Sequence, residues 1–281
     1  MIQAKLKSYA KLNLALNIIG KTNSLHKIES IVAFNSLHDE ILIKKIKSKS
    51  HNIIFTGKFS KNIYRKNTVS KLLEILDSKG LLKELKFEIK INKKIPNKAG
   101  LGGGSMNAAN ILKYFVIKKI IKISKKELLK ISKLIGSDVI LGLNSKNSIL
   151  NSKNQIIHLN NTKKFYTLIV KPSFGCSTKE IFSKIRKFDK PKLNYPSKRM
   201  FEISFLKKMD NSLEPIVFAK YKKLKKIKLF LENLSKPIFV RMTGSGSALV
   251  AYFLSKQRCN NAKKIFSKKY KNYWCIASKT I

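Results

Sequence analysis

The sequence has 281 residues, of which 43% are hydrophobic, and its 60 basic and 15 acidic side chains give a formal net charge of +45. This length suits one large domain or two ordinary ones, and the apolar fraction suffices for a folded core. No apolar run reaches the length of a membrane span, and residues 1–8 lack the apolar centre of a signal peptide. The sequence therefore predicts no membrane-spanning helix, and we expect no membrane partner.

The positive charge has two interpretations, a nucleic-acid binder or a lysine-rich proteome of low GC content. Arginine is the better residue for recognising phosphates and base edges, because its guanidinium is a planar fork of donors. Only five of the basic residues are arginine, and the lysines are spread along the whole chain. We therefore favour the second interpretation and expect no specific nucleic-acid partner, although the charge should attract anionic ligands.

The cysteines predict a reducing environment. Cys176, Cys259 and Cys275 are odd in number and form no Cys-x-x-Cys pair. This pattern fits reduced thiols in a cytoplasmic protein better than a disulfide framework or a zinc site.

The first part of the chain is rich in strand patterns. Strands are expected at residues 5–17, 28–37, 40–46, 53–55 and 85–91, with a turn at 20–27. Between the last two strands, a helix capped by Asn67 or Thr68 should run to Gly80, because Asn and Thr cap helix starts and Gly commonly follows helix ends.

Two further helices are expected before residue 140. One should begin at Ser105. The next is opened by a capping box, in which Ser124 and Glu127 satisfy each other's unpaired backbone donors, and it should stop near Gly136.

The remainder of the chain predicts an α+β arrangement. Residues 144–163 are polar and rich in asparagine, with a short strand at 156–158, and are the best candidate for a domain junction. Strands are expected at 165–170, 238–242, 247–253 and 274–277. A helix is expected from 178, one or two helices between the polar stretch at 187–199 and residue 234, and a last helix at 261–269. The loop at 172–177, the polar stretch at 187–199 and the small-residue turn at 243–247 connect them.

The segment 96–109 is the most informative part of the sequence. Gly100, Gly102, Gly103 and Gly104 fall within five residues, between a predicted strand and a predicted helix. Glycines let backbone N–H groups approach a ligand closely, and a helix start adds free N–H groups and a positive dipole end. The segment therefore predicts a site for a phosphorylated ligand, most simply a nucleotide.

Three phosphate-loop patterns can be compared with this segment. The P-loop pattern fails because the chain has no Gly-Lys-Ser/Thr, and the dinucleotide pattern fails because Ser105 stands where its third glycine belongs. The pattern P-x-x-x-G-L-G-x-x-S-x-x-A-A matches, and it resembles the ATP loop of the GHMP kinases, the superfamily of galactokinase, homoserine kinase and mevalonate kinase. A glycine-rich connection without a ligand is disfavoured, since four glycines cost conformational entropy.

Further segments resemble one branch of this superfamily, in the same order along the chain. That branch phosphorylates the 2-hydroxyl of 4-diphosphocytidyl-2-C-methyl-D-erythritol in the non-mevalonate route to isoprenoid precursors. The matching segments are residues 8–14, 15–21, 100–105, 135–139, 211–215 and 241–247.

The resemblance implies a fold and a set of ligands. The fold would be the α+β, two-domain GHMP kinase fold. Residues 1–155 would form an N-terminal domain like a ribosomal-protein domain, with the ATP loop, and residues 156–281 a ferredoxin-like C-terminal domain. The ligands would be ATP, Mg²⁺ and a small cytidine diphosphate substrate.

The resemblance also implies roles for individual residues. Asp138 would accept the proton of the acceptor hydroxyl, and Lys11 would be its neighbour, hold it ionised and offset charge on the phosphoryl group. ATP would be bound by Pro96, Asn97, Lys98, Ala99, Gly100, Leu101, Gly102, Gly103, Gly104, Ser105 and Met106. The substrate would be bound by Asn13, His26, Gly244 and Ser245. No protein metal site is implied beyond Mg²⁺ arriving with ATP, with Ser105 as its candidate contact.

Each role has a simpler alternative. Lys11 would otherwise be a solvated lysine, Asp138 and Ser105 helix caps, and His26 an exposed side chain in a turn. The turn at 243–247 would otherwise be a plain connection between two strands.

The chain also departs from the pattern of this branch. Leu25 replaces the tyrosine of a Tyr-His pair that recognises cytosine, Met106 and Asn107 replace Ser-Asp in the ATP loop, and Ile140 replaces a proline. A GHMP kinase with another acceptor, of homoserine or mevalonate type, is therefore a second hypothesis. A basic RNA-binding protein on a related fold is a third, and an inactive kinase a fourth.

Overall fold

The computed structural model describes residues 3–22 and 25–281, which form two compact α/β units. Unit 1 consists of residues 3–10, 37–97 and 102–145, and unit 2 of residues 11–36, 98–101 and 146–281. The chain therefore passes between the units several times. The expected N-terminal domain at 1–155 and C-terminal domain at 156–281 stay a prediction.

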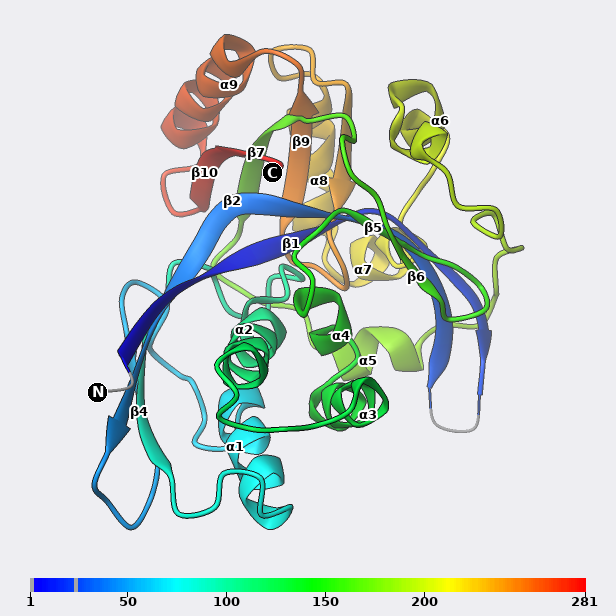
Figure 1. Ribbon diagram of the computed structural model, residues 1–281. Coiled ribbons are helices and arrows are strands. Elements are labelled where there is room, and N and C mark those ends of the chain that lie inside the picture. Colours follow the sequence, from blue (N-terminus) through cyan, green and yellow to red (C-terminus); the bar gives the residue numbers. More distant parts are fainter. Residues whose placement is uncertain (1–2, 23–24) are drawn as a thin grey trace. The chain divides into compact units, whose positions relative to one another are not determined.

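Ten strands lie in the described residues, and Figure 1 labels most of them. They are β1 (Gln3–Lys21), β2 (His26–Ile46), β3 (Asn52–Thr56), β4 (Lys86–Asn92), β5 (Ser148–Leu150), β6 (Ile156–His158), β7 (Tyr166–Lys171), β8 (Phe239–Met242), β9 (Leu249–Phe253) and β10 (Trp274–Lys279).

The helices of the described residues are mostly short. They are α1 (Thr68–Ser78), α2 (Gly103–Ile117), α3 (Lys125–Ile135), α4 (Val139–Gly142), α5 (Thr178–Ser183), α6 (Ile203–Lys207), α7 (Glu214–Lys220), α8 (Lys222–Glu232) and α9 (Lys256–Lys269), with a 3₁₀ turn at Lys198–Phe201. None of these helices is long and apolar enough to cross a bilayer.

Unit 1 packs helices against a small sheet. The second half of β2 pairs antiparallel with β4, and β3 pairs parallel with β4. Phe87 and Ile89 of β4 join Leu72 of α1 and Ile111 and Phe115 of α2 in one fully buried cluster. The helices α1, α2 and α3 pack against one another (Figure 1). This cluster fixes where β4 ends and α2 begins, and the glycine-rich segment connects those two points.

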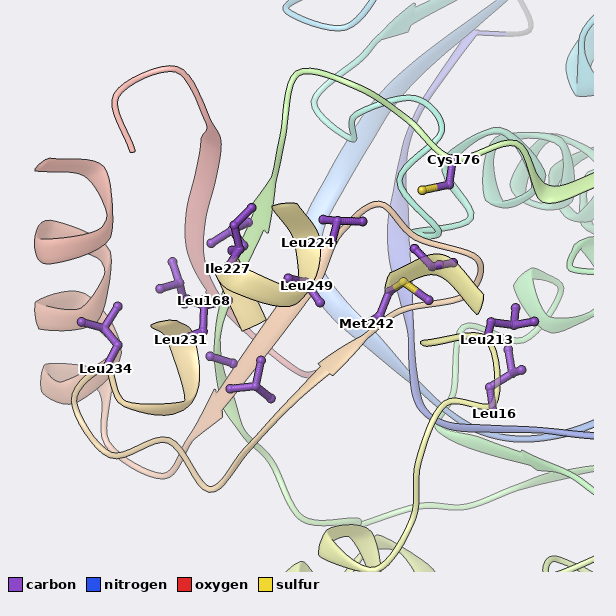
Figure 2. Close-up of a cluster of buried hydrophobic side chains, with 14 of the residues drawn as sticks. Leu16, Leu168, Cys176, Leu213, Leu224, Ile227, Leu231, Leu234, Met242 and Leu249 are labelled. Carbon is purple, nitrogen blue, oxygen red and sulfur yellow. The ribbon is translucent and has the colours of Figure 1, made fainter. Parts of the chain in front are cut away.

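Unit 2 contains a four-stranded antiparallel sheet with the strand order β10-β7-β9-β8. Helices separate β7 from β8 and β9 from β10 along the chain, so the order matches the ferredoxin-like βαββαβ arrangement. Figure 2 shows Leu168 and Leu249 of the sheet in one buried cluster with Leu224, Ile227 and Leu231 of α8. The expected ferredoxin-like second half is thus confirmed.

Several elements differ from the expectation. The strands expected at 28–37 and 40–46 are one strand, β2, which continues through residues 37–40. The turn expected at 20–27 is shorter, because Gly20 and His26 belong to strands; its residues 23–24 lie outside the described residues. The segment up to residue 234 is divided among the 3₁₀ turn, α6, α7 and α8.

Helix starts account for most remaining differences. Helix α2 begins at Gly103 rather than at Ser105, with Gly102 in the left-handed region before it. Helix α9 begins at Lys256 rather than at residue 261, because the Ser255 side chain accepts a hydrogen bond from the Arg258 N–H and caps it. The short elements α4 and β5 carry too few residues for a periodic pattern and were not expected.

We expect Leu231→Ala to destabilise unit 2 by about 2–5 kcal/mol, because it removes a fully buried side chain of α8 and leaves a cavity. The control is Leu229→Ala on the same helix, where the side chain is 52% exposed and the cost should stay below about 0.5 kcal/mol. Urea unfolding followed by circular dichroism measures both. Equal losses in the two variants would contradict the placement of α8.

Candidate functional site

Lys11 and Asn13 share one face of β1, since side chains alternate along a strand. Lys11 is only 4% exposed, and its Nζ donates a hydrogen bond of 2.6 Å to Asn13 Oδ1. Asn13 Nδ2 donates to Ser30 Oγ on β2 at 2.8 Å, and Ser30 Oγ donates to the Ala15 carbonyl at 2.6 Å. The buried chain of donors orients the amide oxygen of Asn13 toward the ammonium. The alternative of a solvated Lys11 is therefore wrong.

The Thr243 hydroxyl connects β1 to two loops of unit 2. It accepts a hydrogen bond from the Asn13 N–H at 3.0 Å and donates to the Gly100 carbonyl at 3.1 Å. The Lys11 N–H donates to the Leu101 carbonyl at 3.0 Å. The two predicted loops thus lie beside the strand that carries Lys11 and Asn13.

Those loops pack backbone against backbone. Gly100 has φ +72°, and a Cβ there would collide with the Thr243 carbonyl oxygen. Gly244 has φ +53°, and a Cβ there would lie 3.1 Å from the Gly100 carbonyl oxygen. Two hydrogen bonds complete the contact, from the Ser247 N–H to the Lys98 carbonyl and from the Ala248 N–H to the Ala99 carbonyl. The turn at 243–247 is therefore more than a plain strand connection, because it supports the glycine-rich loop.

The exit of the glycine-rich loop forms an open helix start in unit 1. Gly102 precedes α2 with φ +69°, and no side chain caps this helix. The Met106 N–H makes the first helical bond, to the Gly102 carbonyl at 2.9 Å. The N–H groups of Gly103, Gly104 and Ser105 thus belong to the first turn, where helices bind anions. Ser105 lies inside the helix, so its alternative role as a helix cap is wrong.

Asp138 lies between α3 and α4 in the same unit. Helix α3 ends at Gly136, which lies against Ser105, since a Cβ on Gly136 would be 3.8 Å from Ser105 Oγ. Helix α4 packs very closely on α2, because a Cβ on Gly142 would lie 2.6 Å from that of Ala109. Asp138 is half-buried and its side chain makes no capping bond to α4. The carboxylate is thus placed by the α2–α4 contact and is not used as a helix cap.

The other predicted nucleotide residues are distributed over both units. Pro96 is buried, and Asn97 Nδ2 donates to the Phe59 carbonyl at 2.9 Å, both in unit 1. Residues 98–101 belong to unit 2 together with Lys11, Asn13, His26, Gly244 and Ser245, whereas Asp138 and residues 102–106 belong to unit 1. Ser245 Oγ is 2.9 Å from Thr178 Oγ1.

His26 lies beside two aromatic rings that sequence patterns did not single out. Its ring centroid is 5.3 Å from that of Phe182 and 6.5 Å from that of Phe188. Burial, together with the nearby Lys21 charge, lowers the pKa of His26 below its usual value. His26 therefore favours the neutral form, which offers one donor and one acceptor nitrogen. The preceding Leu25 is 67% exposed.

The segment that carries Phe188 is held by the β1–β2 hairpin. The buried carboxylate of Glu29 accepts hydrogen bonds from the Lys192 N–H at 2.8 Å and the Leu193 N–H at 3.1 Å. The Asp189 N–H donates to the Ile18 carbonyl at 2.8 Å. These bonds between distant segments explain why local sequence patterns could not identify Phe182 and Phe188 as neighbours of His26.

Comparisons with known proteins agree with this geometry. Residues 66–150 match the model of the GHMP kinases N terminal domain. The chain is 54% identical to the 4-diphosphocytidyl-2-C-methyl-D-erythritol kinase of Pelagibacter ubique (strain HTCC1062), over 99% of each chain. It is 31% identical to the kinase of the same name from Clostridium tetani (strain Massachusetts / E88), over 99% of this chain and 100% of that one.

A solved structure is also similar. The crystal structure of a 4-(cytidine 5'-diphospho)-2C-methyl-D-erythritol kinase superposes with a TM-score of 0.77 at 21% identity, over 99% of this chain and 100% of the other. This likeness shows the fold.

We expect Gly100→Ala to be far more destabilising than Gly80→Ala. Both glycines have positive φ, +72° and +66°, so alanine is conformationally strained at either position. Only Gly100 also meets a backbone carbonyl, whereas nothing lies within 4 Å of a Cβ on Gly80. Gly80→Ala should cost about 1 kcal/mol and Gly100→Ala about 3 kcal/mol or more, measured by chemical unfolding. Similar costs would mean that the two loops do not pack as described.

Proposed function

The chain belongs to the 4-diphosphocytidyl-2-C-methyl-D-erythritol kinase family of GHMP kinases, and we infer that its glycine-rich loop and buried polar strand carry out that reaction. It is a phosphotransferase with an alcohol acceptor. It transfers the γ-phosphoryl group of ATP to the 2-hydroxyl of 4-diphosphocytidyl-2-C-methyl-D-erythritol, a step toward isoprenoid precursors. The observation that carries the assignment to residues is the uncapped start of α2 behind Gly102.

Phosphate binding is assigned to the segment 96–106. The first-turn N–H groups of α2 have no side-chain cap, and Gly102–Ser105 are partly or fully exposed. A phosphate there would accept these hydrogen bonds and lie at the positive end of the helix dipole. The backbone of 98–101 is shaped by its packing on residues 243–248, which leaves the loop little freedom to collapse when nucleotide leaves.

Asp138 is assigned as the general base. As the acceptor oxygen bonds to the γ-phosphorus, the bond from that phosphorus to the β,γ-bridging oxygen breaks and ADP leaves. The hydroxyl proton passes to the Asp138 carboxylate. Its position supports this role, since it follows Gly136, which lies against Ser105 in the first turn of α2.

Lys11 is assigned to electrostatic stabilisation. Phosphoryl transfer needs positive charge near the equatorial oxygens of the transferred group. A buried ammonium interacts more strongly than an exposed one, because water screens it less. Its bond to Asn13 Oδ1 fixes the direction of the side chain.

Cytosine recognition is assigned to His26 and its two aromatic neighbours. A neutral imidazole can exchange hydrogen bonds with the base edge, and Phe182 and Phe188 provide ring faces for stacking. Asn13, Gly244 and Ser245 are assigned to the substrate as well.

Mg²⁺ is assigned to the nucleotide rather than to a protein cage. Among residues 3–22 and 25–281, no group of three or more His, Cys, Asp or Glu side chains could hold a metal. The Ser105 hydroxyl, partly exposed in the first turn of α2, is the oxygen ligand we assign to the ion. Mg²⁺ would neutralise charge on the phosphates when bound. We assign the enzyme to the cytoplasm, consistent with the free thiols of Cys176, Cys259 and Cys275.

We expect the purified protein with Mg-ATP to form ADP in the presence of 4-diphosphocytidyl-2-C-methyl-D-erythritol and not with homoserine or mevalonate. Asp138→Asn should lower kcat by about 10²–10⁴-fold, because the amide cannot accept the proton. Coupled ADP release measures turnover, and calorimetry measures ATP binding, which should change little in the variant.

Two results would contradict these assignments. Turnover of homoserine or mevalonate in place of the cytidine substrate would refute the acceptor. Loss of ATP binding in Asp138→Asn would show that the carboxylate is structural.

We expect Phe188→Leu and His26→Ala to raise KM for the cytidine substrate about tenfold, corresponding to one lost stacking or hydrogen-bonding contact, with KM for ATP unchanged. Tyr195→Leu is the matched control, because Tyr195 is 90% exposed further along the same segment. Because His26 has a lowered pKa, KM of the parent enzyme should rise only as pH falls below about 6.5, where the ring begins to protonate. Unchanged KM in both variants would place cytosine elsewhere.

A further inference from the structure

A buried carboxylate in unit 1 is not used in the reaction described above. Asp39 lies on β2, and its side chain is fully buried. Its Oδ1 accepts hydrogen bonds from the backbone N–H groups of Lys94 and Ile95, both at 2.8 Å. Its Oδ2 forms an ion pair with Lys93 Nζ and accepts a hydrogen bond from Asn107 Nδ2 at 3.0 Å. Four donors therefore converge on one carboxylate.

Stability alone does not account for this arrangement. The Lys93 side chain is only 3% exposed, so two charges have been taken out of water. Desolvation of such a pair consumes much of its Coulomb attraction, and an apolar replacement is often as stable. A buried pair is better explained by the geometry that it specifies, and here the geometry concerns the glycine-rich loop.

The donors of Asp39 lie on both sides of that loop. Lys93, Lys94 and Ile95 directly follow β4 and lead into it, whereas Asn107 lies on α2, directly after it. One carboxylate therefore fixes the separation between the entrance and the exit of residues 96–106. The tie does not pass through the loop itself, so the loop residues stay available for a ligand.

The negative charge of Asp39 also offsets the repulsion between the Lys93 ammonium and the start of α2. Lys93 Nζ lies beneath the first turn of α2, since a Cβ on Gly103 would be 3.2 Å from it. An ammonium at a helix N-terminus is repelled by the positive dipole end. The Asp39 carboxylate offsets this repulsion and holds the ammonium in place.

Asn107 is oriented for this tie. Its Nδ2 donates to Asp39, while its Oδ1 is buried and has no hydrogen-bond partner in the described part of the chain. The opposite amide orientation would turn Oδ1 toward the carboxylate, which cannot donate. An unsatisfied buried acceptor is costly, so the bond to Asp39 explains the orientation.

We propose that Asp39 is a positioning residue for the nucleotide: by tying residues 93–95 to Asn107, it presets the glycine-rich loop and the start of α2 for the phosphates. The inference rests on the proposed function, in which residues 96–106 bind ATP. It concerns nucleotide affinity and not the acceptor.

The test measures Mg-ADP affinity by calorimetry, which needs no acceptor. Asp39→Asn should weaken Mg-ADP at least about tenfold and raise KM for ATP to match, while KM for the cytidine substrate stays within about twofold. Asp77→Asn is the control, because Asp77 also pairs with a lysine of unit 1, Lys86, and its other partner is His51, between β2 and β3, rather than the segment before the loop. It should lower the melting temperature and leave Mg-ADP affinity unchanged.

A second pair of variants keeps the buried ion pair intact, in case Asp39→Asn does not fold. Asn107→Ala removes only the exit tie and should weaken Mg-ADP at least about threefold. Asn110→Ala is its control, since the Asn110 side chain donates to the Met106 carbonyl of the same helix and does not tie the helix to residues 93–95. Wild-type affinity in folded Asp39→Asn or in Asn107→Ala overturns the inference. Failure of the parent protein to bind Mg-ADP would refute the ATP assignment itself.

Discussion

The unit 2 part of the site depends on the contact between two backbones that only glycine permits. With any side chain at position 100, the loop could not lie on the Thr243 carbonyl, and the Thr243 hydroxyl could not reach both the Gly100 carbonyl and the Asn13 N–H. That hydroxyl holds β1 beside both loops. The direction of the Lys11 side chain depends on the same strand, through Asn13. The steric constraint at Gly100 thus also influences the position of Lys11, the buried lysine two residues before Asn13 on β1.

The buried charges of this protein say more about its site than its net charge does. The net charge of +45 arises mostly from solvated lysines. Lys11 and Lys93 are the informative ones, and each is buried with a different partner. Lys11 donates to the amide oxygen of Asn13, whereas Lys93 forms an ion pair with Asp39. The buried ion pair suits a group that holds structure, and the buried ammonium of Lys11 is the one that we assign to the transferred phosphoryl group.

Sequence patterns correctly predicted the helices and strands that are determined by residues close together in the sequence. Strand β4 alternates strictly, and α1 begins where Asn67 caps it and its side chain accepts two backbone hydrogen bonds. The ATP loop was recognisable because its glycines are adjacent in sequence. The start of α2 was misplaced because serine is a common cap, whereas the structure uses a left-handed Gly102. No local pattern could indicate that.

The contacts that position the site are long-range and lay beyond sequence patterns. Thr243 and Asn13 are separated by 230 positions, and Asn107 and Asp39 by 68. The resemblance singled out Asn13 and Asn107, but nothing in the sequence indicated which partners they have in the fold. Only the fold shows that their donors and acceptors are paired.

The surroundings of His26 bear on the departure of this chain from the sequence pattern at Leu25. Leu25 removes the aromatic ring that the sequence pattern places next to this histidine. In the structure, Phe182 and Phe188 bring two rings to it from a helix and a loop more than 150 positions away. Stacking requires a flat apolar face at the right distance, and any segment of the chain can supply that face. The substitution at Leu25 is therefore weak support for a different acceptor, because the property it removes is present beside His26 from another part of unit 2.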